Sequence, residues 1–311
     1  MAPRQTRWEG VDGTGKPWVC MTGKKQSPIN LPTTKTISRI PRAHQTRWSY
    51  PNLVSNGSNI EIINNGHTIQ VEWLGAYNAE VDITVPANPT DANRITDVIN
   101  MTYTDKATTV KATPLQFHFH ATSEHLIGGK IYPLELHIVH RVTDLPACAS
   151  GCFTVTGIMF ELTTAGDDNA FLKPILDNAP VREGTMNYLP AGDEIELGNL
   201  LPAPTERDYI TYEGSLTTPP CSEGLLWHVL TTPQKISLNQ WRQYRNAVGM
   251  KDCVAKNGTT ENHEHKHHRH LLAAEAETHP EDWSCKVVAH GTNFRNVQKV
   301  YGRKVKLAQA A

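Results

Sequence analysis

The chain has 311 residues, of which 39% are hydrophobic, enough to bury a sizeable core and too many for a disordered chain. Its 30 basic and 31 acidic residues leave a net charge of −1, so we expect neither nucleic acid nor an anionic membrane surface as a partner. No stretch approaches the roughly 18 consecutive apolar residues of a transmembrane helix, so no membrane span is predicted.

Residues 26–230 are mainly β in texture, because short segments rich in Val, Ile, Thr and Phe alternate with Gly, Pro and Asn turns. The regular alternation of strands and helices that predicts a doubly wound sheet is missing. The predicted strands are Ile60–Ile63, His67–Trp73, Glu80–Val85, Gln116–His120, Leu134–His140, Thr154–Phe160 and Leu225–Leu230. The predicted helices are Asn169–Asn178 and Leu238–Val248.

A polar, repetitive segment covers residues 254–282 and contains the histidine-rich run His263–His270. We interpret it as an exposed insertion within the domain, solvated in its simplest interpretation. Weak, non-catalytic metal binding is the alternative, because His-rich tracts bind metals. The chain after it, Asn293–Lys306, has the apolar spacing of a strand or extended segment.

The cysteines and sequons favour a secreted protein. Six cysteines are an even number, and Asn56, Asn100 and Asn257 each begin a glycosylation sequon. The first residues lack the apolar core of a signal peptide, so we expect a mature chain whose leader has been removed. A periplasmic or extracellular location is predicted; an oxidising organelle lumen and a cytosolic protein with free thiols are the alternatives.

Two predicted strands carry three histidines that can meet. His118 and His120 share one strand face, because side chains alternate along a strand, and Phe117 and Phe119 then face the buried side. If the strand carrying His137 is a neighbour, the three imidazoles converge. Three histidines with an open fourth position make a catalytic zinc site, whereas structural zinc sites are usually closed by four ligands. We therefore predict one Zn²⁺ per chain.

Both strands also place an acceptor beside a histidine. Gln116 and Glu135 each lie two residues before a histidine on the same face. They can accept the second ring N–H and so fix the tautomer and the ring orientation. A lone HxH pair is more typical of a surface coincidence or of hydrogen-bonded core histidines. The third histidine with its same-face Glu favours the metal site.

Cupins, small β-barrels that bind a metal through three His and a Glu, are an alternative fold for this histidine pattern. His118, His120 and Glu124 have the spacing of the cupin HxH…E motif. However, Ala112 and Ile131 stand where that motif has glycines, and no second cupin motif follows. We therefore set the cupin aside.

Seven segments resemble motifs of the α-class carbonic anhydrases, and the resemblance as a whole runs from about Trp8 to Lys306, excluding the insertion at 254–282. In chain order they are Gln26–Asn30 (QSPIN), Asn65–His67 (NGH), Gln116–His120 (QFHFH), Ser123–His125 (SEH), Glu135–His140 (ELHIVH), Gly214–Pro220 (GSLTTPP) and Asn293–Arg295 (NFR, with Phe for Trp). The cysteine pattern and the His-rich insertion are most similar to the secreted green-algal type.

The resemblance implies a single domain over residues 1–311 that is mainly β (α+β). Its centre would be a large twisted, mostly antiparallel sheet with a few short peripheral helices. The implied function is reversible hydration of CO2 to bicarbonate and a proton, by attack of zinc-bound hydroxide on CO2 in an apolar pocket. Zinc lowers the pKa of its bound water to about 7, and carbonic anhydrase is itself the standard example.

The resemblance also assigns roles around the zinc. Thr217 would accept a hydrogen bond from the hydroxide and donate its own hydroxyl hydrogen bond to Glu124, while its backbone N–H holds a substrate oxygen. Asn293 would support the ligands together with Gln116 and Glu135. The substrate pocket would comprise Thr217 and six further residues: Val139, Val155, Leu216, Thr218, Leu225 and Trp227. Of these, Val139 also follows from the strand pattern, because it shares the face of His137.

His67, after an Asn-Gly turn, is the implied proton shuttle, because a histidine with a pKa near 6.5 exchanges protons in both directions near neutrality. A strand histidine is by itself more often structural. Trp8 is not followed by the family's usual tyrosine, so the water network of the shuttle is expected to differ. Ala121 also replaces the Trp of animal relatives.

Six cysteines permit 15 pairings. The resemblance supports Cys20–Cys221, which would steady the loop carrying the catalytic threonines. Cys148–Cys152 is a plausible local bridge around Gly151, which would leave Cys253 and Cys285 to pair and close the insertion. A disulfide-linked C-terminal fragment or an oligomer is a further candidate partner.

The same residues leave two alternatives to a carbonic anhydrase. One is a non-catalytic zinc-binding module on the same scaffold, and the other is a general zinc esterase. The presence of His118, His120, His137, Glu124 and Thr217 favours the carbonic anhydrase. Ester hydrolysis is expected as a side activity.

Overall fold

The computed structural model describes residues 8–33, 37–86, 107–142, 152–255, 283–287 and 293–310. The strands are β1 (Asn30–Leu31), β2 (Ser38–Arg39), β3 (Arg47–Ser49), β4 (Leu53–Val54), β5 (Ile60–Asn64), β6 (Ile69–Trp73), β7 (Glu80–Pro86), β8 (Ala107–His120), β9 (Leu126–Ile127), β10 (Leu134–Val142), β11 (Cys152–Leu162), β12 (Thr185–Tyr188), β13 (Glu194–Ile195), β14 (Tyr209–Ser215), β15 (Glu223–Leu230), β16 (Gln234–Ile236), β17 (Met250–Ala255), β18 (Trp283–Val287) and β19 (Val305–Ala308). The helices are α1 (Leu172–Asp177) and α2 (Leu238–Gly249), with 3-10 turns at η2 (Arg42–His44), η5 (Leu197–Leu200) and η6 (Pro204–Glu206).

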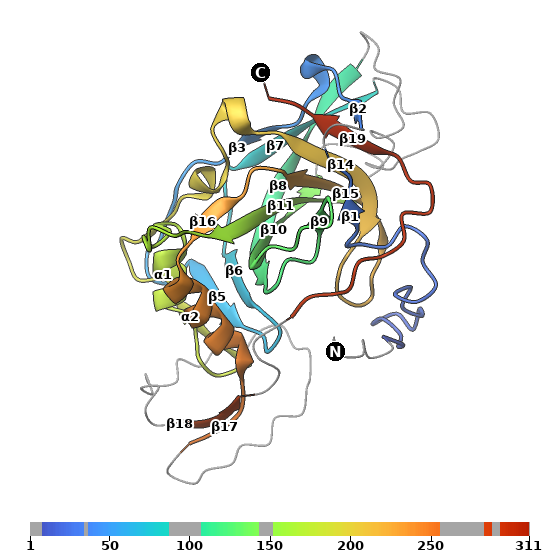
Figure 1. The fold of residues 1–311 in the computed structure, drawn as a ribbon. Coiled ribbons are helices and arrows are strands. Elements are labelled where there is room, and N and C mark those ends of the chain that lie inside the picture. Colours follow the sequence, from blue (N-terminus) through green and yellow to red (C-terminus); the bar gives the residue numbers. More distant parts are fainter. Residues whose placement is uncertain are drawn as a thin grey trace.

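A large sheet organises the described residues, and its main path runs β12-β5-β6-β8-β10-β11-β15-β14-β19-β2. Most neighbours are antiparallel, while β11 pairs in parallel with β15 and β16, and β19 pairs in parallel with β2. The sheet is twisted, and α1 and α2 lie together at one side of it beside β5 and β6 (Figure 1). The predicted mainly β fold with a large, mostly antiparallel sheet and few helices is confirmed.

All seven predicted strands are present, but β8 is far longer than the predicted Gln116–His120. Its first half pairs with β7, from Pro86 opposite Ala107 to Val81 opposite Ala112. The extension passes Pro114, where the register with β10 shifts. A proline has no N–H for a ladder bond, so it is tolerated at such an irregularity.

The helix predicted over Asn169–Asn178 is shorter, at Leu172–Asp177. The Asn169 side-chain oxygen accepts hydrogen bonds from the backbone N–H groups of Phe171 and Leu172. An asparagine that holds the first free N–H groups in this way lies before the helix rather than within it.

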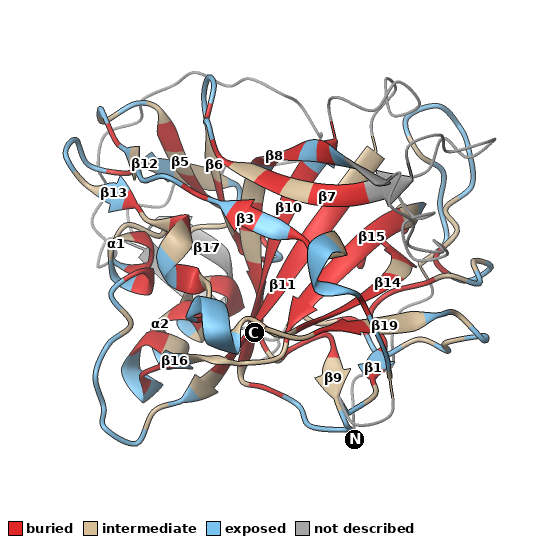
Figure 2. Ribbon diagram, turned by 90° about the horizontal axis from the view of Figure 1, so that it is seen from above, coloured by how far each residue is buried: buried red, intermediate tan, exposed pale blue. Residues whose placement is uncertain are grey.

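The larger core lies on the sheet face away from the three histidines. Phe117, Phe119, Leu136 and Ile138 are fully buried there, as their alternation predicts, and they join a cluster that includes residues of α1 and α2. Seen from above, β10 is buried along almost its whole length, and β11 and β15 are buried over most of theirs (Figure 2). The ligand strands are therefore held by packing from behind.

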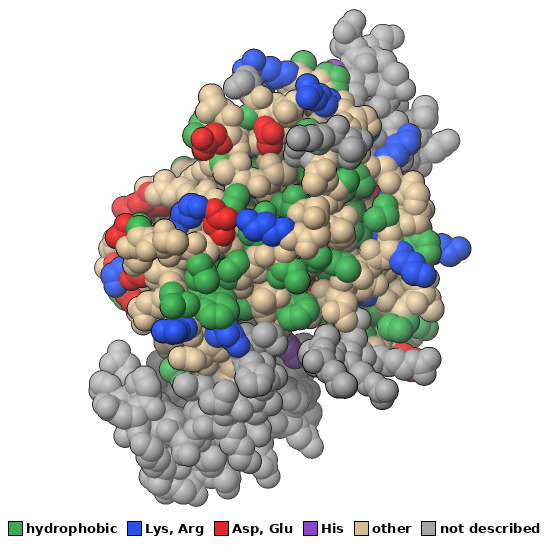
Figure 3. Space-filling view, in the orientation of Figure 1, with side chains coloured by type: hydrophobic (Ala, Val, Ile, Leu, Met, Phe, Trp, Pro, Cys, Tyr) green, Lys and Arg blue, Asp and Glu red, His purple; other side chains and the backbone are tan. Residues whose placement is uncertain are grey.

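The strand pair β17–β18 joins the two ends of the predicted 254–282 insertion, with Val254 opposite Ser284. Residues 256–282, including the His-rich run, lie outside the described residues. On the face drawn in Figure 3, basic and acidic side chains are interspersed around a more apolar middle. Among the described helices, none has the length and apolar character needed to cross a membrane.

Candidate metal centre

The three predicted ligand histidines converge. Strands β8 and β10 pair so that His118 lies opposite His137, which puts both side chains on one sheet face. The ring centroids are 5.3 Å apart for His118 and His137, and 4.5 Å apart for His120 and His137. One ring nitrogen from each of the three lies within 4.8 Å of the others. This spacing suits closure around a single ion at metal–nitrogen distances of about 2.0–2.1 Å.

Hydrogen bonds to the outer ring nitrogens determine which nitrogens face the centre. The Nδ1 atom of His118 lies 2.9 Å from Gln116 Oε1, and that of His120 lies 3.0 Å from the carbonyl oxygen of Asn293. Both partners only accept, so each Nδ1 carries the proton and each Nε2 keeps its lone pair. For His137 the pattern is reversed, because its Nε2 donates to Glu135 Oε1 at 2.8 Å. The nitrogens that face the centre with a lone pair available to a metal are therefore His118 Nε2, His120 Nε2 and His137 Nδ1.

Behind His137, a buried chain of polar groups supports Glu135. His125 Nδ1 also donates to Glu135 Oε1, at 2.7 Å, so its Nε2 accepts from the Tyr212 hydroxyl at 2.6 Å. Ser27 Oγ lies 2.8 Å from the same hydroxyl. The other carboxylate oxygen, Oε2, accepts the backbone N–H groups of Glu124 and His125, each at 2.8 Å. Every lone-pair direction of this carboxylate is thereby engaged, which fixes the His137 ring.

Burial and these partners shift the pKa values of the cluster. Burial lowers the pKa of His118 well below its usual range, and the neighbouring His120 and His137 lower it further. Burial also lowers the pKa of His137 although Glu135 opposes the shift. For Glu135, burial alone raises the pKa, but His125 and His137 outweigh it and hold the pKa well below the usual range. The site thus combines neutral imidazoles with an ionised carboxylate, which is the form in which they bind or support a metal.

Two buried atoms at the centre have no hydrogen-bond partner among the described residues, His120 Nε2 and Glu124 Oε2. They lie 3.6 Å apart, and Glu124 Oε2 is 4.0 Å from His137 Nδ1. The other Glu124 oxygen accepts the backbone N–H of Arg295 at 2.7 Å. Buried polar atoms without partners are costly. A cation bound by the three inward nitrogens gives His120 Nε2 a partner and places a positive charge near Glu124 Oε2, so these residues fit a metal ion.

Asn293 closes the end of the first ligand strand. Its Oδ1 accepts the N–H of Ala121 at 2.8 Å, and its Nδ2 donates to the carbonyl of Phe119 at 2.9 Å. The Asn293 carbonyl also accepts a hydrogen bond from His120 Nδ1. These contacts hold the strand on both sides of the metal ligand His120.

An apolar row crosses the same sheet face next to the ligands. In register, Val139 lies opposite Val155, Val155 lies beside Trp227, and Trp227 lies opposite Tyr212. Leu225 belongs to the same buried cluster, and the partly buried Leu216 packs against it. The five apolar residues predicted for the substrate pocket therefore form one group, whose Trp227 ring centroid is 4.8 Å from that of His137.

The two predicted threonines differ in exposure. Thr217 is buried, whereas Thr218 is exposed. They follow β14 in a loop whose ends are tied by hydrogen bonds from Leu216 N to Ser222 O at 3.0 Å and from Cys221 N to Thr218 O at 2.9 Å. This loop ends at the Cys20–Cys221 disulfide, with an S–S distance of 2.10 Å, so that predicted pairing is confirmed.

The remaining predicted residues lie near the surface or outside the described part. His67 is exposed after the β5–β6 turn, and its backbone N–H donates to Asn65 Oδ1. Asn56 is also exposed. Cys152 is disulfide-bonded, while the side chains of Cys148, Cys253 and Cys285 lie outside the described residues. Asn100 and Asn257 lie outside them too.

Sequence reasoning gave no role to three residues that the structure brings to this site. His125 orients Glu135, and only its place in the SEH motif drew attention to it. A Cβ on Gly157 would lie 3.3 Å from Glu135 Oε1, so this strand glycine leaves room for the carboxylate. Arg295 contacts Glu124 through its backbone, which no side-chain pattern reveals.

Comparison with known proteins points to one family. The sequence profile described as eukaryotic-type carbonic anhydrase matches residues 4–309 of this chain. A carbonic anhydrase from Nostoc is 35% identical over 222 residues, covering 70% of this chain and 67% of the Nostoc protein.

Solved structures agree with the sequence comparison. The α-carbonic anhydrase of Thermovibrio ammonificans, solved with the inhibitor sulfanilamide, matches with a TM-score of 0.58 at 28% identity, over 93% of this chain and 89% of that chain. Carbonic anhydrase Cah3 from Chlamydomonas reinhardtii, solved with acetazolamide, matches with a TM-score of 0.61 at 27% identity, over 97% of this chain and 99% of that chain.

Proposed function

The chain belongs to the eukaryotic-type carbonic anhydrase family and is an enzyme of reversible CO2 hydration, and from this premise we propose which of its residues carry the reaction. The observation that carries the proposal is the convergence of three imidazole nitrogens on one point, beside a buried Glu124 oxygen that has no hydrogen-bond partner among the described residues. The family is zinc-dependent, and this donor set suits zinc.

His118, His120 and His137 would hold the zinc ion, one per chain. When bound, zinc acts as a Lewis acid that brings the pKa of a coordinated water toward neutrality, a chemistry for which carbonic anhydrase is the standard example. Gln116, Glu135 and the carbonyl of Asn293 keep the outer ring nitrogens protonated, so that the inward nitrogens remain donors.

Glu124 and Thr217 form the proposed orienting pair. Glu124 Oε2 has no hydrogen-bond partner among the described residues, so it can accept a hydrogen bond from the Thr217 hydroxyl. The Thr217 oxygen then has only lone pairs to offer the nucleophile and accepts a hydrogen bond from it. Such a one-way hydrogen bond leaves the nucleophile's own lone pair directed at the substrate.

The apolar row is the proposed CO2 pocket, comprising Val139, Val155, Leu216, Leu225 and Trp227, with Thr217 and Thr218 at its polar edge. Carbon dioxide has no charge or dipole to bind strongly, so a dry apolar surface beside the ligands suits it. The clustering of these side chains on the ligand face supports the assignment.

His67 is the proposed proton shuttle. Its exposure supports this role, because a shuttle must reach buffer in solution. Histidine is the residue type whose ordinary pKa lets it take up and release protons near neutrality.

An oxidising compartment suits the chain, and we assign it to a secreted carbonic anhydrase of the green-algal type. The Cys20–Cys221 disulfide and the likeness to the Chlamydomonas protein support this assignment. Exposed Asn56 would then be available for glycosylation, because its sequon lies on a surface turn.

Zinc content and CO2 hydration, measured on the same samples, test the proposed site. For His118→Ala we expect bound zinc and activity to fall together. The matched control His67→Ala should keep one zinc per chain. A His118→Ala protein with full zinc and a normal rate would remove these histidines from the mechanism.

A further inference from the structure

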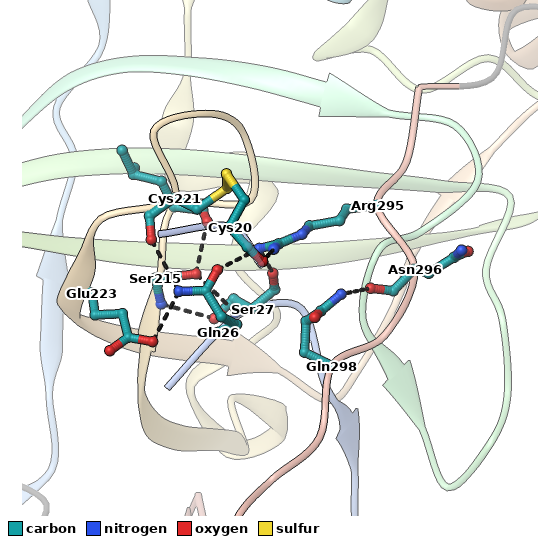
Figure 4. Close-up of a disulfide and its surroundings, with 10 residues drawn as sticks. Cys20, Gln26, Ser27, Ser215, Cys221, Glu223, Arg295, Asn296 and Gln298 are labelled. Carbon is teal, nitrogen blue, oxygen red and sulfur yellow. Dashed lines mark hydrogen bonds between the residues drawn. A yellow bond between two sulfur atoms is a disulfide. The ribbon is translucent and has the colours of Figure 1, made fainter. Parts of the chain in front are cut away.

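The Arg295 side chain is buried against the N-terminal segment, where its guanidinium binds three oxygens. It donates to the carbonyl of Cys20 at 2.8 Å, to Gln26 Oε1 at 3.0 Å and to the carbonyl of Ser27 at 2.7 Å. Only 2% of the residue is exposed. Figure 4 shows the guanidinium pointing into this group of acceptors. A planar, permanently charged fork with several donors suits such an arrangement, and a lysine ammonium does not reproduce it.

The backbone of the same residue contacts the reaction site. Its N–H donates to Glu124 Oε1 at 2.7 Å, and Glu124 Oε2 is the unpartnered oxygen beside His120. Arg295 therefore holds the N-terminal segment with its side chain and a carboxylate of the centre with its main chain.

The acceptors of the guanidinium are also anchored to the threonine loop. Cys20 is bonded to Cys221, and Gln26 Nε2 donates to the carbonyl of Cys221 at 3.1 Å. The loop that ends at Cys221 carries Thr217. Glu124 and Thr217 come from different parts of the chain. Both are thus connected to the same buried group of contacts around the Arg295 guanidinium.

We infer that Arg295 is a positioning residue of the reaction: its guanidinium fixes its own backbone N–H, and that N–H sets the orientation of Glu124 relative to Thr217. The inference rests on the role proposed above for Glu124. A group that sets the orientation of a reacting pair acts on kcat, because small misplacements cost large factors in rate. The apolar pocket is untouched, so KM should change little.

Arg295→Lys tests the inference, with Arg303→Lys as the matched control. The Arg303 guanidinium binds the carbonyls of Gln26 and Glu213 in the same region, but its backbone N–H donates to Val300 instead of Glu124. For Arg295→Lys we expect kcat to fall about 10- to 100-fold with KM within about 2-fold and zinc content unchanged. For Arg303→Lys, kcat should stay within about 2-fold of the unmodified enzyme.

A double-mutant cycle separates positioning from general destabilisation. In a Glu124→Ala background the N–H of Arg295 has lost its acceptor, so Arg295→Lys should then change kcat by less than about 2-fold. An equal loss in both backgrounds would make Arg295 merely structural and overturn the inference. So would a normal kcat for Arg295→Lys. If Glu124→Ala itself had a normal rate, the proposed role of Glu124 would fail first, and the inference with it.

Gln26→Ala provides a second route if Arg295→Lys does not fold. It removes one acceptor of the guanidinium and the link to Cys221 while keeping Arg295. A smaller loss of kcat in the same direction, again absent in the Glu124→Ala background, is expected. A loss that persists in that background would contradict the inference.

Discussion

His137 Nε2 donates a 2.8 Å hydrogen bond to Oε1 of Glu135, two residues earlier on the same strand. The same carboxylate accepts His125 Nδ1 and two backbone N–H groups. Four donors around one buried carboxylate make its charge and its position part of the metal site, because they leave the His137 ring one orientation and one tautomer.

Glu135→Gln should therefore weaken zinc binding by about 10- to 100-fold. A glutamine offers one acceptor oxygen and brings an NH2 group toward donors, so one or more of the four bonds is lost. Competition with a chromophoric chelator measures the affinity. Glu161→Gln is the control, because Glu161 pairs with Lys130 and Lys235 at the surface of β11. Equal zinc affinity in both variants would contradict the assigned role.

Gly157→Ala should disturb the same carboxylate from the neighbouring strand. The new Cβ would lie 3.3 Å from Glu135 Oε1, which is closer than most such contacts, and 3.4 Å from Val229 Cγ2, so the carboxylate would have to shift by a few tenths of an ångström. We expect a loss of about 1–3 kcal/mol in the free energy of unfolding, as for other overpacked cores, together with weaker zinc binding. Gly13→Ala is the control, because nothing lies within 4 Å of its added Cβ. Unchanged stability and zinc affinity for Gly157→Ala would show that Glu135 does not need this space.

The ligand strands could be predicted because their chemistry is local in sequence. Alternation alone put His118 and His120 on one face with Phe117 and Phe119 behind, and a third histidine with a same-face Glu completed the pattern. What alternation could not give was the pairing of β8 with β10, which the family resemblance supplied. The extension of β8 was missed because Pro114 argues against a strand, and only the irregular register around it makes room for that residue.

The supporting residues could not be predicted for a different reason. Arg295 acts through a backbone N–H and through carbonyls of Cys20 and Ser27, which no residue type reveals. Gly157 matters because it has no side chain, which leaves space for the Glu135 carboxylate. The Arg295 contacts join segments more than 100 residues apart in sequence; Ser27 and Arg295, for example, are separated by 268 residues.

Acid should destabilise the fold through two histidines behind the sheet. Burial lowers the pKa of His140 and of His228 to about 3, whereas both have pKa values near 6.5 in the unfolded chain. The unfolded state therefore binds more protons between these values, so stability falls as the pH drops from about 6.5 toward 3. Each histidine contributes a slope of about 1.4 kcal/mol per pH unit in that window.

Urea unfolding at a series of pH values measures this slope. Hydroxyl groups lie within hydrogen-bond distance of both rings: that of Tyr50 for His140, and those of Thr46 and Thr154 for His228. His228→Gln should remove one histidine's share of the slope. If the free energy of unfolding fell equally with acid in His228→Gln and in the unmodified protein, His228 would not be the group that titrates.

His67→Ala should slow CO2 hydration in dilute buffer while leaving zinc content unchanged. Without the exposed imidazole, the proton released in each turnover must pass directly to buffer, so the rate becomes limited by buffer concentration. Added imidazole should restore part of the rate, because the free base carries the same functional group and can take the proton in place of the missing side chain. Stopped-flow hydration at rising buffer concentration makes the measurement, with the same series on the unmodified enzyme as control. If the variant responds to buffer and imidazole no more than the unmodified enzyme does, the proton leaves by a route that does not include His67.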